Sequence, residues 1–202
     1  MSDGTPLQRI VLVRHAETPW SLTGQHTGST DLPLTDTGRD KVVLAGQRLR
    51  GQVFTRVLTS PLTRARETCE LTGFAGQAEL HDGLREWDYG RYEGLTTPTI
   101  REQSPGWELY RDGAPGGESP DEVAARVDEL VGELVALCRS GGHALLFSHG
   151  HLLRALAVRW IRQPIALGRV LGLGTGSIST LGWKRELRVI EHWNDRSHLE
   201  VA

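Results

Sequence analysis

The sequence predicts an α/β fold, a three-layer domain in which helices cover both faces of a mostly parallel central sheet. Three short aliphatic runs support this prediction, at residues 10–13, 56–58 and 144–147. Each run ends abruptly at cationic or titratable side chains, and a helical pattern follows. Strands that alternate with helices in this way are typical of parallel sheets.

One domain accounts for the length of the chain. A chain of 202 residues fits one hydrophobic core of ordinary size. We therefore interpret residues 1–202 as a single domain. Residues 74–118 are interrupted by Gly and Pro and are poor in aliphatic residues. Because such a segment cannot hold a core of its own, we expect it to be an irregular cover over the active face.

Hydrophobic periodicity and turn residues place the individual elements. Strands are expected at residues 9–14, 55–59, 76–80, 144–148, 177–183 and 187–193. Helices are expected to start within residues 34–38 and end near residue 50, and to span residues 62–71, 95–103, 119–140 and 151–161. Residues 21–33 are rich in Gly, Thr and Ser and are expected to form a loop.

The clearest helix start is the segment at residues 119–122. Ser119 suits the N-cap, Pro120 the first helical position, and Asp121 and Glu122 the positive end of the helix dipole. The apolar stripe that follows keeps a 3.6-residue spacing and consists of Val123, Val127, Leu130, Val131, Leu134 and Leu137. Glu118, just before this start, serves either the helix or a cover over the site.

Composition and charge exclude several classes of function. The net charge is −2, so no general basic field attracts nucleic acid. No apolar stretch reaches membrane-spanning length, and residues 1–7 lack the apolar core of a signal peptide. The two cysteines, Cys69 and Cys138, lie in no metal-binding spacing, and we interpret them as buried thiols, with a disulfide left open. These features predict a cytoplasmic protein with no nucleic-acid or membrane partner.

The ends of the three strands carry the residues with chemical potential. In an open α/β sheet, ligands bind outside the carboxyl ends of the strands, so Arg14, His15, Arg64 and His149 should meet there. Two arginines and two histidines around one pocket suit a phosphate. A neutral His15 is placed to attack phosphorus, and a protonated His149 and the backbone N–H groups after it would contact the phosphate oxygens. Taken alone, Arg64 could equally be a surface helix residue.

A leaving alkoxide needs a proton from a nearby acid. Glu86 is the best candidate, because the flanking Trp87 and Tyr89 would desolvate it. Asp88 and Glu93 are nearby rivals.

Four motifs in order resemble the histidine phosphatase superfamily, the family of phosphoglycerate mutases and many acid phosphatases. The motifs are Arg14-His15 with Glu17-Thr18 and Trp20, Ser60-Pro61-Leu62 with Arg64-Ala65, Glu86 before Gly90 and Glu93-Gly94, and Ser148-His149-Gly150. The resemblance runs from about residue 9 to residue 199. It implies a phosphoglycerate mutase-like fold and a phosphohistidine intermediate, without a metal or other cofactor.

The resemblance also assigns roles to individual residues. His15 would be the phosphorylated nucleophile, Glu86 the proton donor, and His149 the second catalytic histidine. The substrate-binding residues would be Arg14, Arg64, Ser21, Thr27, Gly28 and Gly150. Two positions depart from the family pattern: Ala16 stands where the family usually has Gly, and Ser21 where it often has Asn. We expect altered tuning from both, because a Ser hydroxyl still donates one hydrogen bond.

Phosphatase is the preferred activity, on small phosphate monoesters and with an acidic optimum. Mutases of this family carry a long basic insertion after the Glu motif, whereas residues 91–118 are short and contain only Arg91, Arg101 and Arg111 as basic residues. Phosphoglycerate mutase remains the alternative, and a non-catalytic protein that binds phosphorylated ligands is a second alternative. The resemblance also suggests a homodimer.

Overall fold

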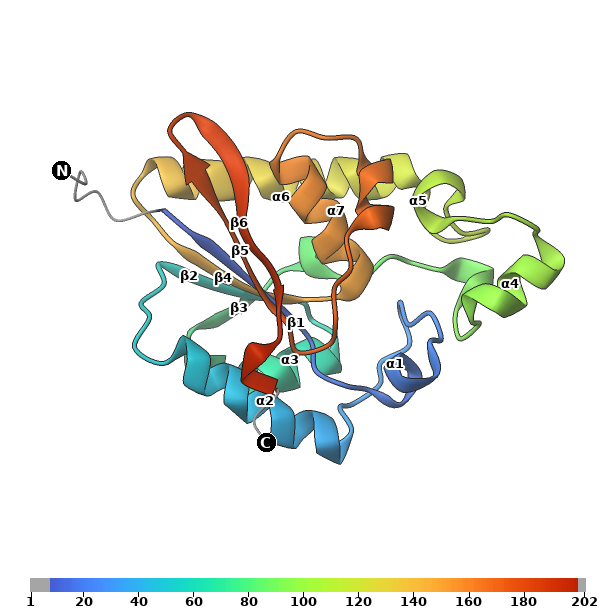
Figure 1. The fold of residues 1–202 in the computed structure, drawn as a ribbon, viewed down its shortest axis with the longest axis horizontal. Helices are drawn as coiled ribbons and strands as arrows, with labels where there is room; N and C mark the ends of the chain where they lie inside the picture. Colours follow the sequence, from blue (N-terminus) through green and yellow to red (C-terminus); the bar gives the residue numbers. More distant parts are fainter. Residues whose placement is uncertain (1–7, 200–202) are drawn as a thin grey trace.

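A six-stranded sheet forms the centre of the computed structural model, which describes residues 8–199 (Figure 1). The strand order is β3-β2-β4-β1-β5-β6. The first four strands in this order are parallel to one another. At the other side of the sheet, β5 pairs antiparallel with β1, and β6 pairs antiparallel with β5. The bounds are β1 Ile10–Arg14, β2 Arg56–Thr59, β3 Ala78–Leu80, β4 Ala144–Ser148, β5 Ile178–Lys184 and β6 Leu187–Asp195. The predicted α/β class is therefore confirmed.

Strand β4 lies between β1 and β2, and this brings three distant segments together. Arg14 pairs with Ser148 across β1 and β4, and Thr59 pairs with Phe147 across β2 and β4. Because all three strands are parallel, their carboxyl ends reach the same edge of the sheet. The residues that follow each strand are consequently neighbours in space.

Helices cover both faces of the sheet, as Figure 1 shows. Strand β1 alternates between the two faces. Val11 and Val13 pack in the core cluster of α2 (Asp36–Leu49) and α3 (Thr63–Leu71). Ile10 and Leu12 pack in the cluster of α6 (Pro120–Arg139) and α7 (Gly150–Trp160). The three predicted layers follow from this division of the apolar residues.

The start of α6 is built as the sequence predicts. Ser119 is the N-cap, its side chain accepts a hydrogen bond from the Glu122 N–H, and the Glu122 side chain accepts one from the Ser119 N–H. Pro120 occupies the first helical turn. Glu118 immediately before it accepts hydrogen bonds from the Arg126 guanidinium at 2.9 and 2.8 Å, so it braces the helix start against the second turn.

The chain contains more regular structure than the sequence predicts, both within the cover of residues 74–118 and outside it. Helix α4 (Thr97–Gln103) matches the expected helix, but α1 (Pro19–Thr23) and α5 (Leu109–Asp112) were not expected, nor were the 3₁₀ helices. The 3₁₀ helices are η1 Ala75–Gln77, η2 Asp82–Leu84, η3 Gly90–Tyr92, η4 Ile165–Val170 and η5 Ser197–Leu199. All of these segments are a few residues long, which is too short for an apolar period to be visible in the sequence.

Aromatic side chains anchor the cover to the main core. Trp87, Tyr89, Tyr92, Trp107 and Tyr110 are buried in the same cluster as α6 and α7. The aromatic residues thus replace the missing aliphatic ones.

A backbone-to-backbone contact closes this region. A Cβ at Gly117 would lie 2.2 Å from the Asp88 carbonyl oxygen and 2.6 Å from the Gly90 nitrogen. Only glycine fits at position 117, and the backbone there lies directly against the backbone of residues 88–90.

The structure also describes both cysteines. Cys69 and Cys138 are both buried and unbonded, so the open question of a disulfide is answered. Within residues 8–199, no helix combines the length and the apolar character needed to cross a membrane.

Candidate active site

His15 follows β1 directly and is held in a defined orientation. Its backbone N–H donates to the Ser148 carbonyl at 2.9 Å, and its ring Nδ1 lies 2.7 Å from the Ala16 carbonyl oxygen. Because a carbonyl only accepts, Nδ1 carries the proton and Nε2 has a free lone pair. Burial, together with Arg14 and Arg64, lowers the pKa of His15 well below its ordinary value. The ring is therefore neutral and presents Nε2 as a nucleophile.

Ala16 is accommodated without disturbing this arrangement. The residue is buried, and its N–H donates to the Thr68 hydroxyl on α3 at 3.1 Å. The Thr68 hydroxyl donates in turn to the Arg64 carbonyl at 2.7 Å. The segment after His15 is thus tied to the helix that carries Arg64.

Arg64 is buried at the edge of the sheet, and Arg14 is partly buried there. Arg14 donates one N–H to the Leu173 carbonyl, and its Nε is buried without a partner among the described residues. Arg64 is fully buried, which rules out the interpretation as a surface helix residue. Burial lowers the pKa of each guanidinium below its ordinary value. The cost of burying two cations is consistent with an anionic ligand between them.

His149 is bound to Arg64 and to Ser60. The Arg64 Nε donates to the His149 Nδ1 at 3.1 Å, so the imidazole proton resides on Nε2, which lies 2.8 Å from the Ser60 hydroxyl oxygen. The ring centroids of His149 and His15 are 5.3 Å apart. Burial and the neighbouring Arg64 lower the pKa of His149 well below its ordinary value. His149 is thus neutral in the unliganded site, whereas the sequence predicts the protonated form. A bound anion would favour the protonated form.

Glu86 lies over the start of α7. Its carboxylate accepts hydrogen bonds from three backbone N–H groups: His151 at 3.0 Å, Leu152 at 2.9 Å and Trp87 at 3.0 Å. The expected burial beside Trp87 and Tyr89 is present. However, two of the N–H groups expected to face a phosphate are used by Glu86. The Gly150 N–H has no acceptor within residues 8–199, and a Cβ at Gly150 would lie 3.1 Å from the Arg14 guanidinium carbon. Its contact with a phosphate stays a prediction.

The loop at residues 27–30 contacts Arg64 through its carbonyl groups. Arg64 donates to the carbonyls of Thr27 at 2.9 Å, Gly28 at 3.0 Å and Thr30 at 3.0 Å. The loop is held from behind by Glu93, which accepts from the N–H groups of Gly28 at 2.9 Å and Thr30 at 3.0 Å. Thr27 and Gly28 are therefore close to the site, and their carbonyls orient the cation.

The other candidates lie elsewhere or have other partners. The Ser21 hydroxyl forms the capping box of α1 with Thr18, accepting at 2.9 Å and donating at 2.9 Å. Its contact with a phosphate stays a prediction. Asp88 is exposed and caps the turn at Gly90. Glu93 binds the loop as just described, so Glu86 is the candidate acid whose carboxylate is closest to the α7 start.

Sequence reasoning missed two contributions. Ser60 was considered only as part of a motif, yet its hydroxyl fixes the ring of His149. Glu93 was considered as a rival acid and as part of a motif, yet its carboxylate anchors the loop that orients Arg64. A Ser at the end of a strand and a Glu before a glycine carry no local signal of their partners, since those partners are 89 and 65 residues away in the sequence.

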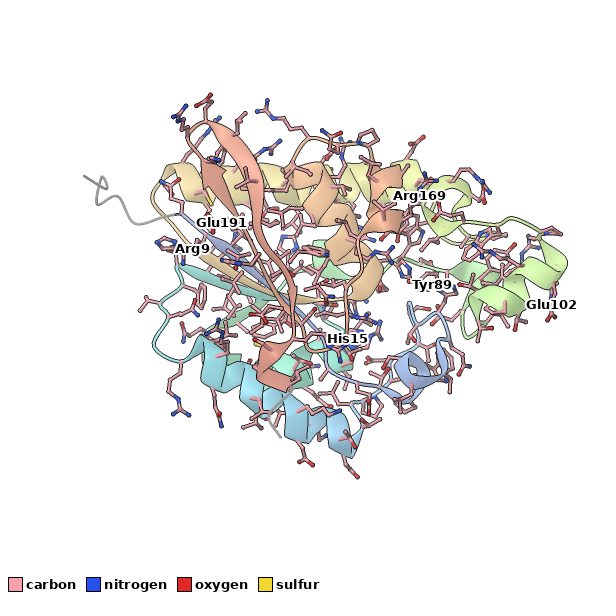
Figure 2. The ribbon with its side chains drawn as sticks, in the orientation of Figure 1. Arg9, His15, Tyr89, Glu102, Arg169 and Glu191 are labelled. Carbon is pink, nitrogen blue, oxygen red and sulfur yellow. The ribbon has the colours of Figure 1, made fainter. Side chains whose placement is uncertain are left out.

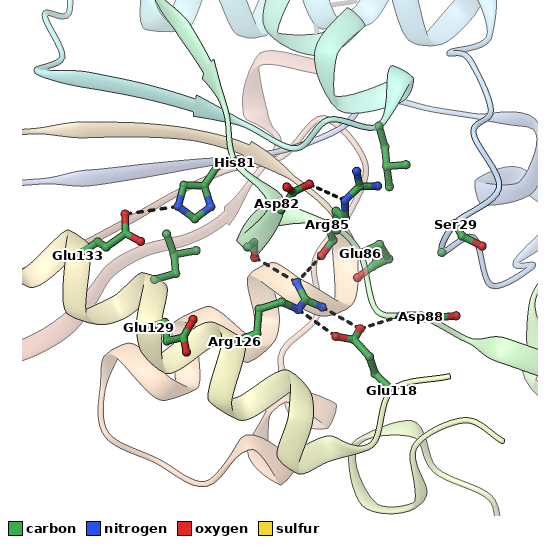
Figure 3. A pocket seen from close by; sticks show the side chains of 14 residues that line it. Ser29, His81, Asp82, Arg85, Glu86, Asp88, Glu118, Arg126, Glu129 and Glu133 are labelled. Atoms are coloured by element: carbon green, nitrogen blue, oxygen red, sulfur yellow. Dashed lines mark hydrogen bonds and ion pairs between the residues drawn. The ribbon is translucent and has the colours of Figure 1, made fainter. Parts of the chain in front are cut away.

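A cavity of about 600 Å³ opens beside Glu86, and we call it the acidic cavity. Six carboxylates line it: Asp82, Glu86, Asp88, Glu118, Glu129 and Glu133. Figure 3 shows that its two arginines are already paired, Arg126 with Glu118 at 2.8 Å and Arg85 with Asp82 at 2.8 Å. Its wall is therefore negative beyond what its cations neutralise.

The comparison with known proteins decides the family. The sequence model of the histidine phosphatase superfamily, branch 1, matches residues 10–196. This chain belongs to that superfamily.

Individual relatives span nearly the whole chain. An acid phosphatase of Mycobacterium tuberculosis is 43% identical over 92% of this chain and 91% of its own length. A probable phosphoglycerate mutase of Salmonella choleraesuis is 32% identical over 96% of this chain and 95% of its own length. The solved structure of a mycobacterial glucosyl-3-phosphoglycerate phosphatase is 32% identical, covers 93% of this chain and 98% of its own, and superposes with a TM-score of 0.80.

Proposed function

We propose that this histidine phosphatase hydrolyses small phosphate monoesters through a phosphohistidine on His15. One observation supports this most strongly: the neutral His15 ring has its Nε2 free beside the guanidinium groups of the partly buried Arg14 and the buried Arg64. Phosphoryl transfer requires that the reacting groups are positioned and that cationic groups contact the non-bridging oxygens of the phosphate. Both are supplied by the chain itself.

The first step transfers the phosphoryl group to the enzyme. The lone pair of His15 Nε2 forms the bond to phosphorus while the bond from phosphorus to the ester oxygen breaks. Protonated Glu86 gives its proton to the departing oxygen, so an alcohol leaves. Arg14, Arg64 and the Gly150 N–H bind the phosphoryl oxygens, and the Ala16 carbonyl holds the Nδ1 proton of His15.

The second step releases phosphate. Ionised Glu86 takes a proton from water, the resulting hydroxide forms a bond to phosphorus, and the bond from phosphorus to Nε2 breaks. The electron pair returns to the His15 ring and Glu86 is protonated again. The bound phosphoryl group carries negative charge, so His149 takes up a proton more readily than in the free site. Because Glu86 must begin the cycle protonated, we expect an acidic optimum.

Hydrolysis is favoured over mutase activity. Residues 91–118 contain three arginines, of which Arg111 pairs with Asp112 at 2.7 Å and Arg91 is exposed. The relative with 43% identity is an acid phosphatase. Two unpaired buried thiols are consistent with a cytoplasmic location. A homodimer is a further expectation, which the mass measured by light scattering would test.

The decisive experiment measures release of p-nitrophenol from p-nitrophenyl phosphate at mildly acidic and neutral pH. His15→Ala should abolish release, and Glu86→Gln should slow it by about 10²–10⁴-fold while phosphate still inhibits. Quenching the native enzyme in alkaline denaturant should trap one phosphoryl group that is stable to alkali and labile to acid, and this group should be absent in His15→Ala. Release that persists in His15→Ala would refute the proposal. Interconversion of 2- and 3-phosphoglycerate faster than hydrolysis would favour the mutase.

A further inference from the structure

The loop that joins η4 to β5, residues 171–177, contacts two residues of the proposed reaction site, and we call it the β5 entry loop. Its Leu173 carbonyl accepts a hydrogen bond from the Arg14 guanidinium. Its Gly176 N–H lies 3.2 Å from the Arg14 carbonyl oxygen and 3.1 Å from that of His15. Figure 2 shows His15 beside this loop. The loop therefore contacts both the nucleophile and the cation next to it.

Arg14 depends on this loop more than Arg64 depends on any one partner. Within residues 8–199, the Leu173 carbonyl is the only acceptor of the Arg14 guanidinium, whereas Arg64 donates to three carbonyls and an imidazole. A long side chain with a single acceptor keeps one direction only as long as that acceptor stays in place. The position of the Leu173 carbonyl consequently decides where Arg14 presents its remaining N–H groups.

The β5 entry loop has little means of fixing its own shape. Residues 171–177 lie in neither a helix nor a strand, and they include Gly172, Gly174 and Gly176. Glycine has the largest backbone freedom of any residue, so a segment with three glycines holds one conformation only when other parts of the chain fix it. Contacts from outside the loop must therefore determine its shape.

The end of β6 makes these contacts through a β-bulge. The register of β5 and β6 shifts between Ile178 and Thr180. Ser179 therefore faces two residues of β6, Trp193 and Asn194. Neighbouring residues of a regular strand point to opposite faces of the sheet, but a bulge redirects one of them. Both side chains consequently reach the β5 entry loop.

Asn194 binds the same peptide group that binds Arg14. The Asn194 side-chain oxygen accepts a hydrogen bond from the Gly174 N–H at 2.7 Å. This N–H and the Leu173 carbonyl belong to one planar peptide group and point in opposite directions. Trp193 fixes the preceding peptide group, because its Nε1 donates to the Gly172 carbonyl at 2.6 Å. The two side chains of the bulge thus set the direction of the Leu173 carbonyl.

The backbone of Asn194 is held in an unusual conformation for this contact. Its φ is 57°, in the left-handed region, although the residue lies within β6. Two other described non-glycine residues have a positive φ, Arg162 just after α7 and Arg185 in the turn between β5 and β6. Such angles are common at helix ends and in hairpin turns. Inside a strand the angle is strained, and strain of this kind clusters at functional sites.

We propose that Asn194 is a positioning residue for Arg14. By accepting the Gly174 N–H, it orients the peptide group whose carbonyl directs the Arg14 guanidinium at the phosphoryl group. The inference rests on the proposed function, because that function assigns the binding of phosphoryl oxygens to Arg14. Its test measures phosphate binding as well as turnover, so the two can fail separately.

The test compares substitutions that separate the acceptor from the backbone conformation. Asn194→Gly adopts a φ of 57° without strain but removes the acceptor, whereas Asn194→Asp keeps an acceptor oxygen. Phosphate affinity is measured by titration calorimetry, and kcat/KM with p-nitrophenyl phosphate. Asn194→Gly should lower both by about tenfold while the midpoint of urea unfolding stays unchanged, and Asn194→Asp should stay within about threefold of native.

Two further variants complete this comparison. Trp193→Phe keeps the ring but loses the donor, so it should produce a smaller loss in the same direction. His192→Ala, at an exposed residue of the same strand, is the matched control and should keep the native values.

A double-mutant cycle assigns the loss to Arg14. In an Arg14→Gln background, Asn194→Gly should change phosphate affinity by less than about twofold. Native affinity in Asn194→Gly would overturn the proposal, whether or not the urea midpoint falls, and so would a tenfold loss that persists in the Arg14→Gln background. A native protein that binds phosphate but releases no p-nitrophenol would refute the proposed function alone. A native protein that binds no phosphate would overturn both.

Discussion

Glu93 offers a sharp test of how the cationic site is held in place. Its carboxylate accepts the N–H groups of Gly28 and Thr30, and the carbonyls of that same loop accept from Arg64. Glu93→Gln keeps the shape of the side chain but removes its charge, and it places an NH₂ group against one of the loop donors. Glu93 thus acts as a positioning residue for Arg64.

The magnitude follows from the bonds that change. Hydrogen bonds to a charged group contribute about 1.5–3 kcal/mol and those to a neutral group about 0.5–1.5 kcal/mol. Neutralising two such bonds therefore costs about 2 kcal/mol. If the loop order is lost at the reacting site, kcat/KM falls about 30-fold, since about 1.4 kcal/mol corresponds to tenfold.

The assay is the kinetics of p-nitrophenyl phosphate hydrolysis, with inorganic phosphate as competitive inhibitor. Glu93→Gln should weaken phosphate binding by a factor similar to the loss in kcat/KM, because Arg64 binds the phosphate in both. Glu93→Asp should recover part of the loss. Glu102→Gln, at an exposed glutamate of α4, should change nothing. The reasoning fails if Glu93→Gln retains kcat/KM within about twofold, or if only the thermal stability changes.

Three further predictions concern the same architecture. Arg64→Lys keeps the charge, but a Lys ammonium cannot donate to three carbonyls and an imidazole at once. The kcat/KM for p-nitrophenyl phosphate should therefore fall about 100-fold. An unchanged value would contradict the role of the branched guanidinium group. Gly117→Ala should destabilise by about 1–3 kcal/mol in urea unfolding, because its Cβ meets backbone, whereas Gly132→Ala has open space and should be neutral or stabilising. Burial lowers the pKa of His26 from 6.5 to about 4, so the unfolded chain binds this proton first and stability falls as the pH drops from about 6.5 to 4, by up to about 3 kcal/mol. His26→Phe should flatten that fall in urea titrations at several pH values, and an equal slope would show that other groups cause it.

The sequence predicts the skeleton of the site because each of its main residues follows a strand. His15, Arg64 and His149 come after three aliphatic runs, and the geometry of a parallel sheet then requires their convergence. The same logic gives no information on side chains that reach the site through loops. Glu93 and Ser60 act through partners far away in the chain, so their roles are visible only in three dimensions.

The charge state of the site also depends on contacts that no local stretch of the sequence shows. The neutral state of His149 depends on the Arg64 Nε directed at its Nδ1, which is a contact over 85 residues. Helix α1, by contrast, was missed because five residues between Pro19 and Thr23 show no period.

The position of β4 between β1 and β2 affects how the chain folds during its synthesis on the ribosome. Strands β1 and β2 leave the exit tunnel first but are not neighbours in the sheet, and they are joined only through residues 144–148, which pair with both. Arg64 and His15 therefore stay apart during most of translation. A nascent chain has no phosphate-binding centre until residues 144–150, near the start of its last third, have been made, and ligands cannot assist the folding of the earlier part.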